Sequence, residues 1–347
     1  ETVLEVAEAR LAPGRNAIVQ RVFGYLLIFG LVVWLGYNFI HAPTQFITVF
    51  LDGVGNGALY ALIALGYTLV YGIIELINFA HGDLFMLSSL FAGFVMVTTF
   101  GADVPSPKNW AYFVVALLAC MAFGAIVNVL IERIAYRRLR RAPKLASLIT
   151  AVGVSFILQW VGLRWNGSTP KQWPSIIPSG GIPLGSVTFN WTTVVLLVFT
   201  VPLLIILTFV VQKTKQGRAM RATAQDQDAA RLMGVNVNRT IAFTFALGGA
   251  MAGAAGLLYL ETSGTTKFDI GFQLGLIAFT AAVLGGIGNL AGAVLGGFLI
   301  GIIQGLNDGL PYSPGQQWSQ TVVFTILILV MVFKPEGLLG KPSVEKV

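Results

Sequence analysis

The sequence predicts an all-α polytopic membrane protein with about ten transmembrane helices. Three observations predict this class: the composition, a series of long apolar runs, and the distribution of charges between those runs. Of the 347 residues, 56% are hydrophobic and 11% are charged, whereas about 25% of the residues in a soluble domain are charged. So few charges could not cover the surface of a soluble protein. The composition therefore excludes soluble enzymes, disordered proteins and coiled coils.

Ten apolar runs are candidate membrane spans. A helix needs about 20 apolar residues to cross the hydrocarbon core, and it satisfies its own backbone hydrogen bonds in lipid. The tract 272–307 is too long for one span, so we expect a break near 285–290, where glycines cluster. Residues 1–21 mix Glu with Arg, unlike a signal peptide, so the first run is expected to be retained as a helix. The ten runs are 22–40, 46–71, 84–100, 110–131, 145–163, 191–211, 240–260, 273–287, 290–307 and 320–333.

The basic residues predict the orientation of these spans. Eighteen of the 22 Lys and Arg fall in segments that ten spans place on one side, and the exceptions are Lys108, Arg164, Lys171 and Lys267. By the positive-inside rule, that side is the cytoplasm. We therefore expect a single membrane domain over 22–333. The expected cytoplasmic segments are an N-terminal segment 1–21, loops 132–144 and 212–239, and a C-terminal tail 334–347. Cations at helix ends, rather than on one solvent face, do not indicate nucleic-acid binding.

A polar segment interrupts the apolar pattern at residues 73–83. It contains Glu75, Asn78, His81 and Asp83. Ionisable groups at membrane depth are costly and usually face the protein interior or a water-filled path. We therefore predict a broken or re-entrant helix that buries these four side chains beside a translocation path. A simpler and compatible interpretation is a polar turn in which Asp83 caps the third span.

The long loop 212–239 is predicted to contain an ordered helix over 218–233. This segment is rich in helix-forming alanines, and glycines stand at both of its ends. Its small side chains would allow another protein to approach closely, whereas the alternative is an amphipathic helix lying on the bilayer. The candidate docking residues are Gly217, Arg218, Arg221, Ala222, Ala224, Ala229, Ala230, Arg231, Leu232 and Gly234.

Glycines at every fourth position predict close helix packing in the seventh and ninth spans. We expect a tight bundle, and contact with more than one chain. The packing residues are Gly249, Gly253, Gly292, Gly296, Gly297, Gly301 and Gly305.

Catalytic and metal sites are not indicated. One cysteine, Cys120, and two histidines are too few for a disulfide framework or a Cys/His metal site. His81 and Asp83 lie two positions apart and would not share a helix face. The string Gly286-Ile-Gly288-Asn-Leu-Ala291 matches a relaxed dinucleotide fingerprint, but it lies between membrane spans and lacks the strand-turn-helix context. We therefore expect no catalytic residue and no cofactor bound by this chain.

Four segments carry a resemblance to a known family. They are 57–72, the string Asn78-Phe79-Ala80-His81-Gly82-Asp83, the loop segment 217–236 and the glycine-rich block 281–297. Together they resemble the permeases of bacterial branched-chain amino acid ABC transporters, of the LivH type. The resemblance covers residues 45–340, roughly, and is specific for the permease family rather than for a substrate.

The resemblance implies ABC importer permease architecture in the bacterial inner membrane, spanning the lipid bilayer many times. The implied partners are a second homologous permease, two cytoplasmic ATPases and an extracytoplasmic substrate-binding protein. ATP and magnesium would bind the ATPases, and 212–239 would be the coupling loop. Branched-chain amino acids are the expected substrates. The alternatives are a urea or amide permease of the same family and, from a different class, an ion-coupled secondary transporter.

Overall fold

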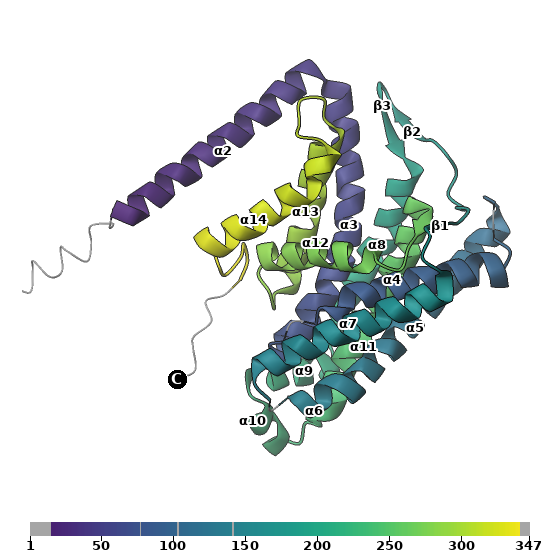
Figure 1. Ribbon diagram of the computed structural model, residues 1–347, viewed down its shortest axis with the longest axis vertical. Coiled ribbons are helices and arrows are strands. Elements are labelled where there is room, and N and C mark those ends of the chain that lie inside the picture. Colours follow the sequence, from purple (N-terminus) through teal and green to yellow (C-terminus); the bar gives the residue numbers. More distant parts are fainter. Residues whose placement is uncertain (1–14, 77, 103, 141, 341–347) are drawn as a thin grey trace, which may run out of the picture.

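The computed structural model describes residues 15–340, except residues 77, 103 and 141. Residues 1–14 of the predicted N-terminal segment 1–21 and residues 341–347 of the predicted tail 334–347 lie outside the described residues. Within the described part, eight helices are long and apolar enough to cross a membrane by length and composition. The other two predicted runs are also helical, in α2 (Arg15–His41) and in the 16-residue α12 (Ile270–Gly285). The predicted all-α membrane class is confirmed (Figure 1).

The described elements follow the predicted order, and proline and polar caps start several of them. Pro43 opens α3, Ser106 accepts a hydrogen bond from the Asn109 amide at the start of α5, and Asn289 caps α13. The remaining helices are α3 (Pro43–Ile74), α4 (Ala80–Gly93) with the π-helical turn η1 (Phe94–Thr99), α5 (Pro107–Ile131) with η2 (Glu132–Tyr136) and α6 (Arg137–Leu139), α7 (Lys144–Asn166), α8 (Trp191–Lys213), α9 (Lys215–Gln225), α10 (Gln227–Leu232), α11 (Val237–Ser263), α13 (Leu290–Gly309), η3 (Gln316–Trp318) and α14 (Ser319–Phe333).

Two small antiparallel sheets, which the sequence pattern did not predict, lie in the loops. Strand β1 (Lys171–Gln172) pairs with β4 (Thr265–Thr266), and β2 (Gly181–Leu184) pairs with β3 (Val187–Asn190). The first pair joins the loop after α7 to the loop before α12. The cavity described below lies between these two helices.

The core of the molecule is formed by α3, α4 and α11. The apolar windows of these helices are 83%, 83% and 72% buried, whereas those of α5, α7, α8 and α14 are mostly exposed. Exposed apolar surface is expected for helices that face lipid, because lipid tails are as apolar as the side chains. Figure 1 shows α2 diverging from the rest of the bundle beyond its junction with α3.

The glycine motifs pack helices of this one chain. Gly297 and Gly301 lie against Ala61 and Gly57 of α3, so that the backbones of α13 and α3 approach closely. On its other face α13 packs on α12 through Gly292 and Gly296, and α11 packs on α5 through Gly249 and Gly253. The close packing is confirmed. Because each motif is satisfied within the chain, the glycines give no indication of a second chain.

Both predicted breaks are present. Helix α3 ends at Ile74, Glu75 adopts a left-handed conformation (φ 51°), and α4 begins only at Ala80. Helix α12 ends at Gly285, after which Gly286 has a φ of 104°.

The described part of the predicted C-terminal tail packs against the second break. The Leu338 amide donates to the Leu284 carbonyl (2.8 Å), and the Leu339 amide donates to Gly285 (3.0 Å). Residues 338–339 therefore lie against the end of α12 instead of extending away from the bundle.

The loop 212–239 contains two helices, so the prediction of a single helix over 218–233 is wrong. The Asp226 side chain accepts hydrogen bonds from the amides of Asp228 (2.8 Å) and Ala229 (3.0 Å), which ends α9 and starts α10. An aspartate in a helix interior competes with the helical hydrogen bonds in this way. Gly234, with a φ of 82°, follows α10 as the predicted stop.

Candidate functional site

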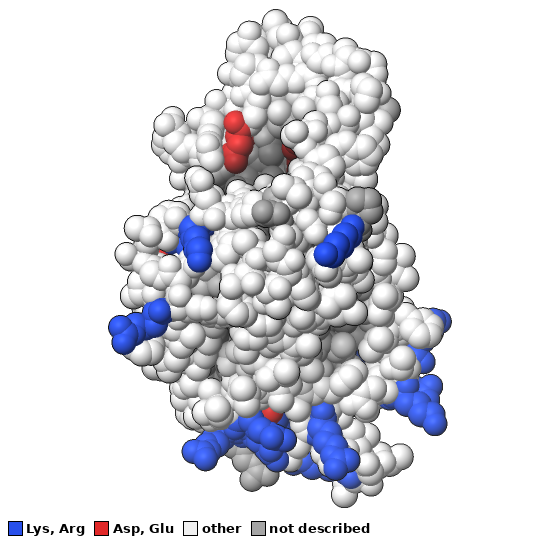
Figure 2. Space-filling view, turned by 90° about the vertical axis from the view of Figure 1, so that its right-hand side faces the viewer, with Lys and Arg blue, Asp and Glu red and all other residues white. Residues whose placement is uncertain are grey.

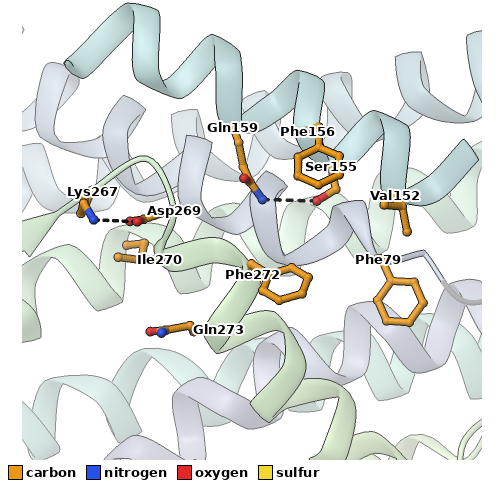
Figure 3. Close-up of a pocket in the computed structure, with 10 residues that line it drawn as sticks. All are labelled: Phe79, Val152, Ser155, Phe156, Gln159, Lys267, Asp269, Ile270, Phe272 and Gln273. Atoms are coloured by element: carbon orange, nitrogen blue, oxygen red, sulfur yellow. Dashed lines mark hydrogen bonds and ion pairs between the residues drawn. The ribbon is translucent and has the colours of Figure 1, made fainter. Parts of the chain in front are cut away.

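The candidate site is a cavity of about 530 Å³ between α7 and α12 (Figure 3). It is partly open to the outside of the chain. Three of its side chains are phenyl rings, and the rest are aliphatic, polar or charged. The lining residues are Phe79, Val152, Ser155, Phe156, Gln159, Lys267, Asp269, Ile270, Phe272 and Gln273.

The α7 wall consists of four residues on one helix face. Val152, Ser155, Phe156 and Gln159 follow the spacing i, i+3, i+4 and i+7, which places them in one row. Figure 3 shows this row facing α12 across the cavity. Helix α12 contributes Ile270, Phe272 and Gln273 to the opposite wall.

Asp83 of α4 is fully buried and contacts two residues of the α7 wall. Its carboxylate accepts a hydrogen bond from the Ser155 hydroxyl and another from the Gln159 side-chain amide (3.1 Å). A buried carboxylate is costly unless it is hydrogen-bonded. Asp83 therefore orients two polar side chains that line the cavity without itself lining it.

The two ends of the cavity differ in chemistry. At one end the Lys267 ammonium and the Asp269 carboxylate form an ion pair with an N–O distance of 2.6 Å. At the other end stands Phe79, which belongs to the break between α3 and α4. In Figure 3 the ion pair lies on the left and Phe79 on the right. The cavity thus leads from the loop before α12 to the break after α3.

The predicted polar residues are buried with one exception. Asn78 accepts a hydrogen bond from the Tyr136 hydroxyl (2.9 Å), and the His81 ring packs edge-on against Tyr67 (4.9 Å between ring centroids). Asn78, His81 and Asp83 are each at most 2% exposed, as predicted. None of the three lines the cavity; their segment contributes Phe79 instead.

The burial prediction is wrong for Glu75. This residue is exposed, because it ends α3 in a left-handed conformation at the end of the molecule where α6, α9 and α10 lie. It lines a second cavity of about 170 Å³, which Arg140 and Gln227 also line. Glu75 thus faces a cavity other than the one beside Asp83.

Sequence reasoning missed most of the residues that line the cavity between α7 and α12, which is called the main cavity below. Ser155 and Gln159 are polar residues four positions apart within the apolar run 145–163, and Gln273 stands at the start of another run. Paired polar residues on one face of a span are the signal that could have indicated them.

Arg140 connects three segments beside the second cavity. It forms an ion pair with Glu132, which is 1% exposed, and its Nη1 donates to the Asn238 side-chain oxygen (2.7 Å) at the start of α11. Burial lowers the pKa of Arg140, while the carboxylate of Glu132 raises it. Gln227 of α10 lines the same cavity. Arg140 is therefore placed between the first break, α11 and α10.

The exposure of the predicted docking residues differs from the expectation. Ala230 is buried, Ala222 and Ala224 are partly buried against the core, and Ala229 is exposed. The large apolar side chains at the end of α10 are instead free of the bundle: Leu232 is 89% exposed and Met233 84% exposed. The expected low surface of alanines is therefore not present as a whole. The exposed apolar surface at this end of α10 is formed by Leu232 and Met233.

The remaining predicted residues of this loop are distributed between α9 and α10. Arg218 is exposed, the Arg221 guanidinium donates to the Val211 carbonyl, and Arg231 pairs with Asp228 (2.8 Å). Gly217 lies inside α9, against the carbonyl of Val211. Figure 2 shows Lys and Arg side chains gathered at the lower end of the molecule, where Figure 1 places α6, α9 and α10.

Comparison with known proteins identifies one family of transport permeases. Residues 49–331 match the family described as branched-chain amino acid transport system, permease component. The chain is 39% identical over 302 residues to the high-affinity branched-chain amino acid transport system permease protein BraD of Pseudomonas aeruginosa, covering 85% of this chain and 96% of that protein. It is 40% identical over 309 residues to the permease protein LivH of Escherichia coli K12 and 39% identical to that of Salmonella typhimurium, covering 87% of this chain and 98% of each relative. With its membrane-spanning helices, both breaks and a match over most of its length, the chain belongs to the family of permease components of branched-chain amino acid transport systems.

Proposed function

We propose that this chain is the membrane-spanning permease subunit of an ATP-driven importer of branched-chain amino acids in the bacterial inner membrane. The similar proteins are named as permeases for these substrates. The observation that carries the proposal is the cavity between α7 and α12, which is bounded by the break after α3 and lined by polar and apolar side chains. A transport path needs such a cavity inside the membrane part of the protein.

A second, homologous permease completes the path. The cavity is partly open, and two of its phenyl rings, Phe156 and Phe272, are 65% and 49% exposed. A second chain packed over α7 and α12 would close the cavity into a chamber. An extracytoplasmic binding protein would deliver the substrate to the end near Lys267 and Asp269.

The basic end of the molecule faces the cytoplasm and receives two ATPases. The gathered Lys and Arg support this orientation through the positive-inside rule. Helices α9 and α10 form the coupling surface, with Leu232 and Met233 as apolar anchors that enter a groove on the ATPase. ATP and magnesium bind the ATPases, and this chain has no catalytic role.

Serine substitutions at Leu232 and Met233 test the coupling surface. Each removes an exposed apolar side chain without altering a span, so the chain should still insert and fold. A central apolar anchor contributes about 2 kcal/mol, which is roughly 30-fold in the dissociation constant. The measurements are co-purification of the ATPases and leucine-stimulated ATP hydrolysis in reconstituted vesicles with the binding protein.

The control is Gln212→Ser, an exposed residue at the end of α8 that should leave assembly unchanged. Ala229→Trp is a second test, because Ala229 is exposed, whereas a tryptophan at the buried Ala230 would disturb the fold itself. Normal ATPase assembly and stimulation in the Leu232 and Met233 variants would contradict this coupling surface. Leucine uptake driven by an ion gradient, without ATPases, would instead identify a secondary transporter.

A further inference from the structure

The main cavity has the charge and shape properties of a binding site for a small zwitterion. It contains one cationic and one anionic side chain, Lys267 and Asp269, and both are at the same end. The opposite end is apolar, with Phe79 and Val152 in contact with the same space. Its volume of about 530 Å³ lies within the range of small-molecule sites, roughly 300–1,000 Å³.

The ion pair is suited to exchange partners with a ligand. The Lys267 and Asp269 side chains are 35% and 43% exposed, and a partly exposed pair contributes little net stability to a fold. A ligand that carries both charges can therefore replace the Lys–Asp contact with two new ones. A ligand with one charge would satisfy one side chain and leave the other without its partner.

The apolar end is suited to a branched aliphatic side chain. Phe272 lies in the middle of the view in Figure 3, between the ion pair and Phe79, and Phe156 faces it from α7. A polar side chain placed among these rings would lose its hydrogen bonds to water without replacement. An apolar side chain would instead gain from leaving water.

We propose that this cavity holds the amino acid during transport, with the α-ammonium group on Asp269, the α-carboxylate on Lys267 and the branched side chain on Phe156 and Phe272. This assignment rests on the proposed function. It adds a specific amino acid binding site to the proposed transport path. Neutral urea carries no charge to bind Lys267 or Asp269 and no apolar group to contact the phenyl rings. The site therefore selects for an apolar amino acid within the membrane subunit itself.

Protection of engineered cysteines by ligand tests this site. Cys120, the only cysteine of this chain, is fully buried, so Val152→Cys or Gln273→Cys provides a single accessible thiol of this chain in the cavity. The purified complex of both permeases and the ATPases is labelled with a small thiol reagent in the presence of L-leucine. By mass action, labelling should slow about tenfold when the leucine concentration is ten times the dissociation constant. Using two cysteine positions guards against failure of one variant to assemble.

Leucine analogues and a matched position give the controls. 4-Methylpentanoate lacks the ammonium group and isoamylamine lacks the carboxylate, so neither should protect at the concentration at which L-leucine does. Thr188→Cys, at the exposed position of strand β3 and outside the cavity, should label at the same rate with and without leucine. Lys267→Gln and Asp269→Asn should each abolish protection of the Gln273→Cys thiol, whereas Lys267→Arg should retain it.

The outcomes separate this inference from the proposed function. If the complex takes up leucine but leucine protects neither cysteine, the subsite is wrong and the importer function stands. If the wild-type complex takes up no leucine in the presence of ATP and the binding protein, the proposed function fails. Equal protection by 4-methylpentanoate would exclude Asp269 as the partner of the ammonium group.

Discussion

Gly66 in α3 leaves the space that the buried His81 imidazole occupies. A Cβ added at this position would overlap the ring of His81, and the Gly248 carbonyl lies 3.1 Å from it on another side. Gly66→Ala must therefore displace a ring that is 1% exposed. We expect this overpacking to cost about 1–3 kcal/mol. The melting temperature of the detergent-purified chain measures the effect.

Gly72→Ala in the same helix is the matched control for Gly66→Ala. There the atom nearest to an added Cβ would be the Gly288 Cα at 3.6 Å, an ordinary contact distance. The control should be neutral or slightly stabilising, because alanine is the better helix former by about 0.5–1 kcal/mol. Equal melting temperatures for the two variants would show that His81 does not depend on Gly66. A double-mutant cycle with His81→Ala should be non-additive, since the two residues are in contact.

At the scale of elements, the short extension of α5 through η2 and α6 links the first break to α11, which in turn packs against α10. Tyr136 of η2 donates to Asn78 in the break, and Arg140 after α6 binds Glu132 and Asn238. A movement of α10 can therefore reach the break through the start of α11 and the extension of α5. This contact chain is a physical route by which coupling at the basic end could change the cavity.

Arg140→Met tests this link. The change leaves the Glu132 carboxylate, whose side chain is 2% exposed, without its cationic partner. Removing one partner of a buried ion pair costs about 3–5 kcal/mol. We expect a lower melting temperature and, in reconstituted vesicles, ATP hydrolysis that leucine no longer stimulates.

Two further variants complete the test of Arg140. Arg138→Met, on the exposed side of α6, removes the same charge and should change little. Combining Arg140→Met with Glu132→Gln removes the unpaired charge, so stability should recover while coupling stays impaired. Recovery of both properties in the double variant would contradict a transmitting role for Arg140.

At the scale of the whole molecule, orientation follows from where the cations gather. We expect Lys213→Cys, at the end of α8, to be protected from an impermeant thiol reagent added outside intact cells, because the proposed orientation places the basic end in the cytoplasm. Thr188→Cys should be labelled from outside, since β3 lies at the opposite end of α8. The reverse pattern would invert the topology, and the buried Cys120 gives no background in either case.

The sequence by itself determined the membrane helices, their order and their membrane class. A helix satisfies its backbone hydrogen bonds locally, and lipid requires an apolar run for each span, so both properties can be read along the chain. The glycine spacing also predicted where helices pack closely. The family resemblance in 57–72, 78–83, 217–236 and 281–297 pointed to the permease family that the match over residues 49–331 shows.

Only the tertiary structure decided which polar residues meet. Asp83 is held by Ser155 and Gln159, more than 70 positions away, so its segment contributes Phe79 to the cavity while the carboxylate stays buried. Glu75 belongs to the same polar string, yet it ends a helix and stays exposed. The physical reason is that a path between helices is lined by whichever faces meet in three dimensions, whereas the pattern along the chain specifies only each helix and its faces.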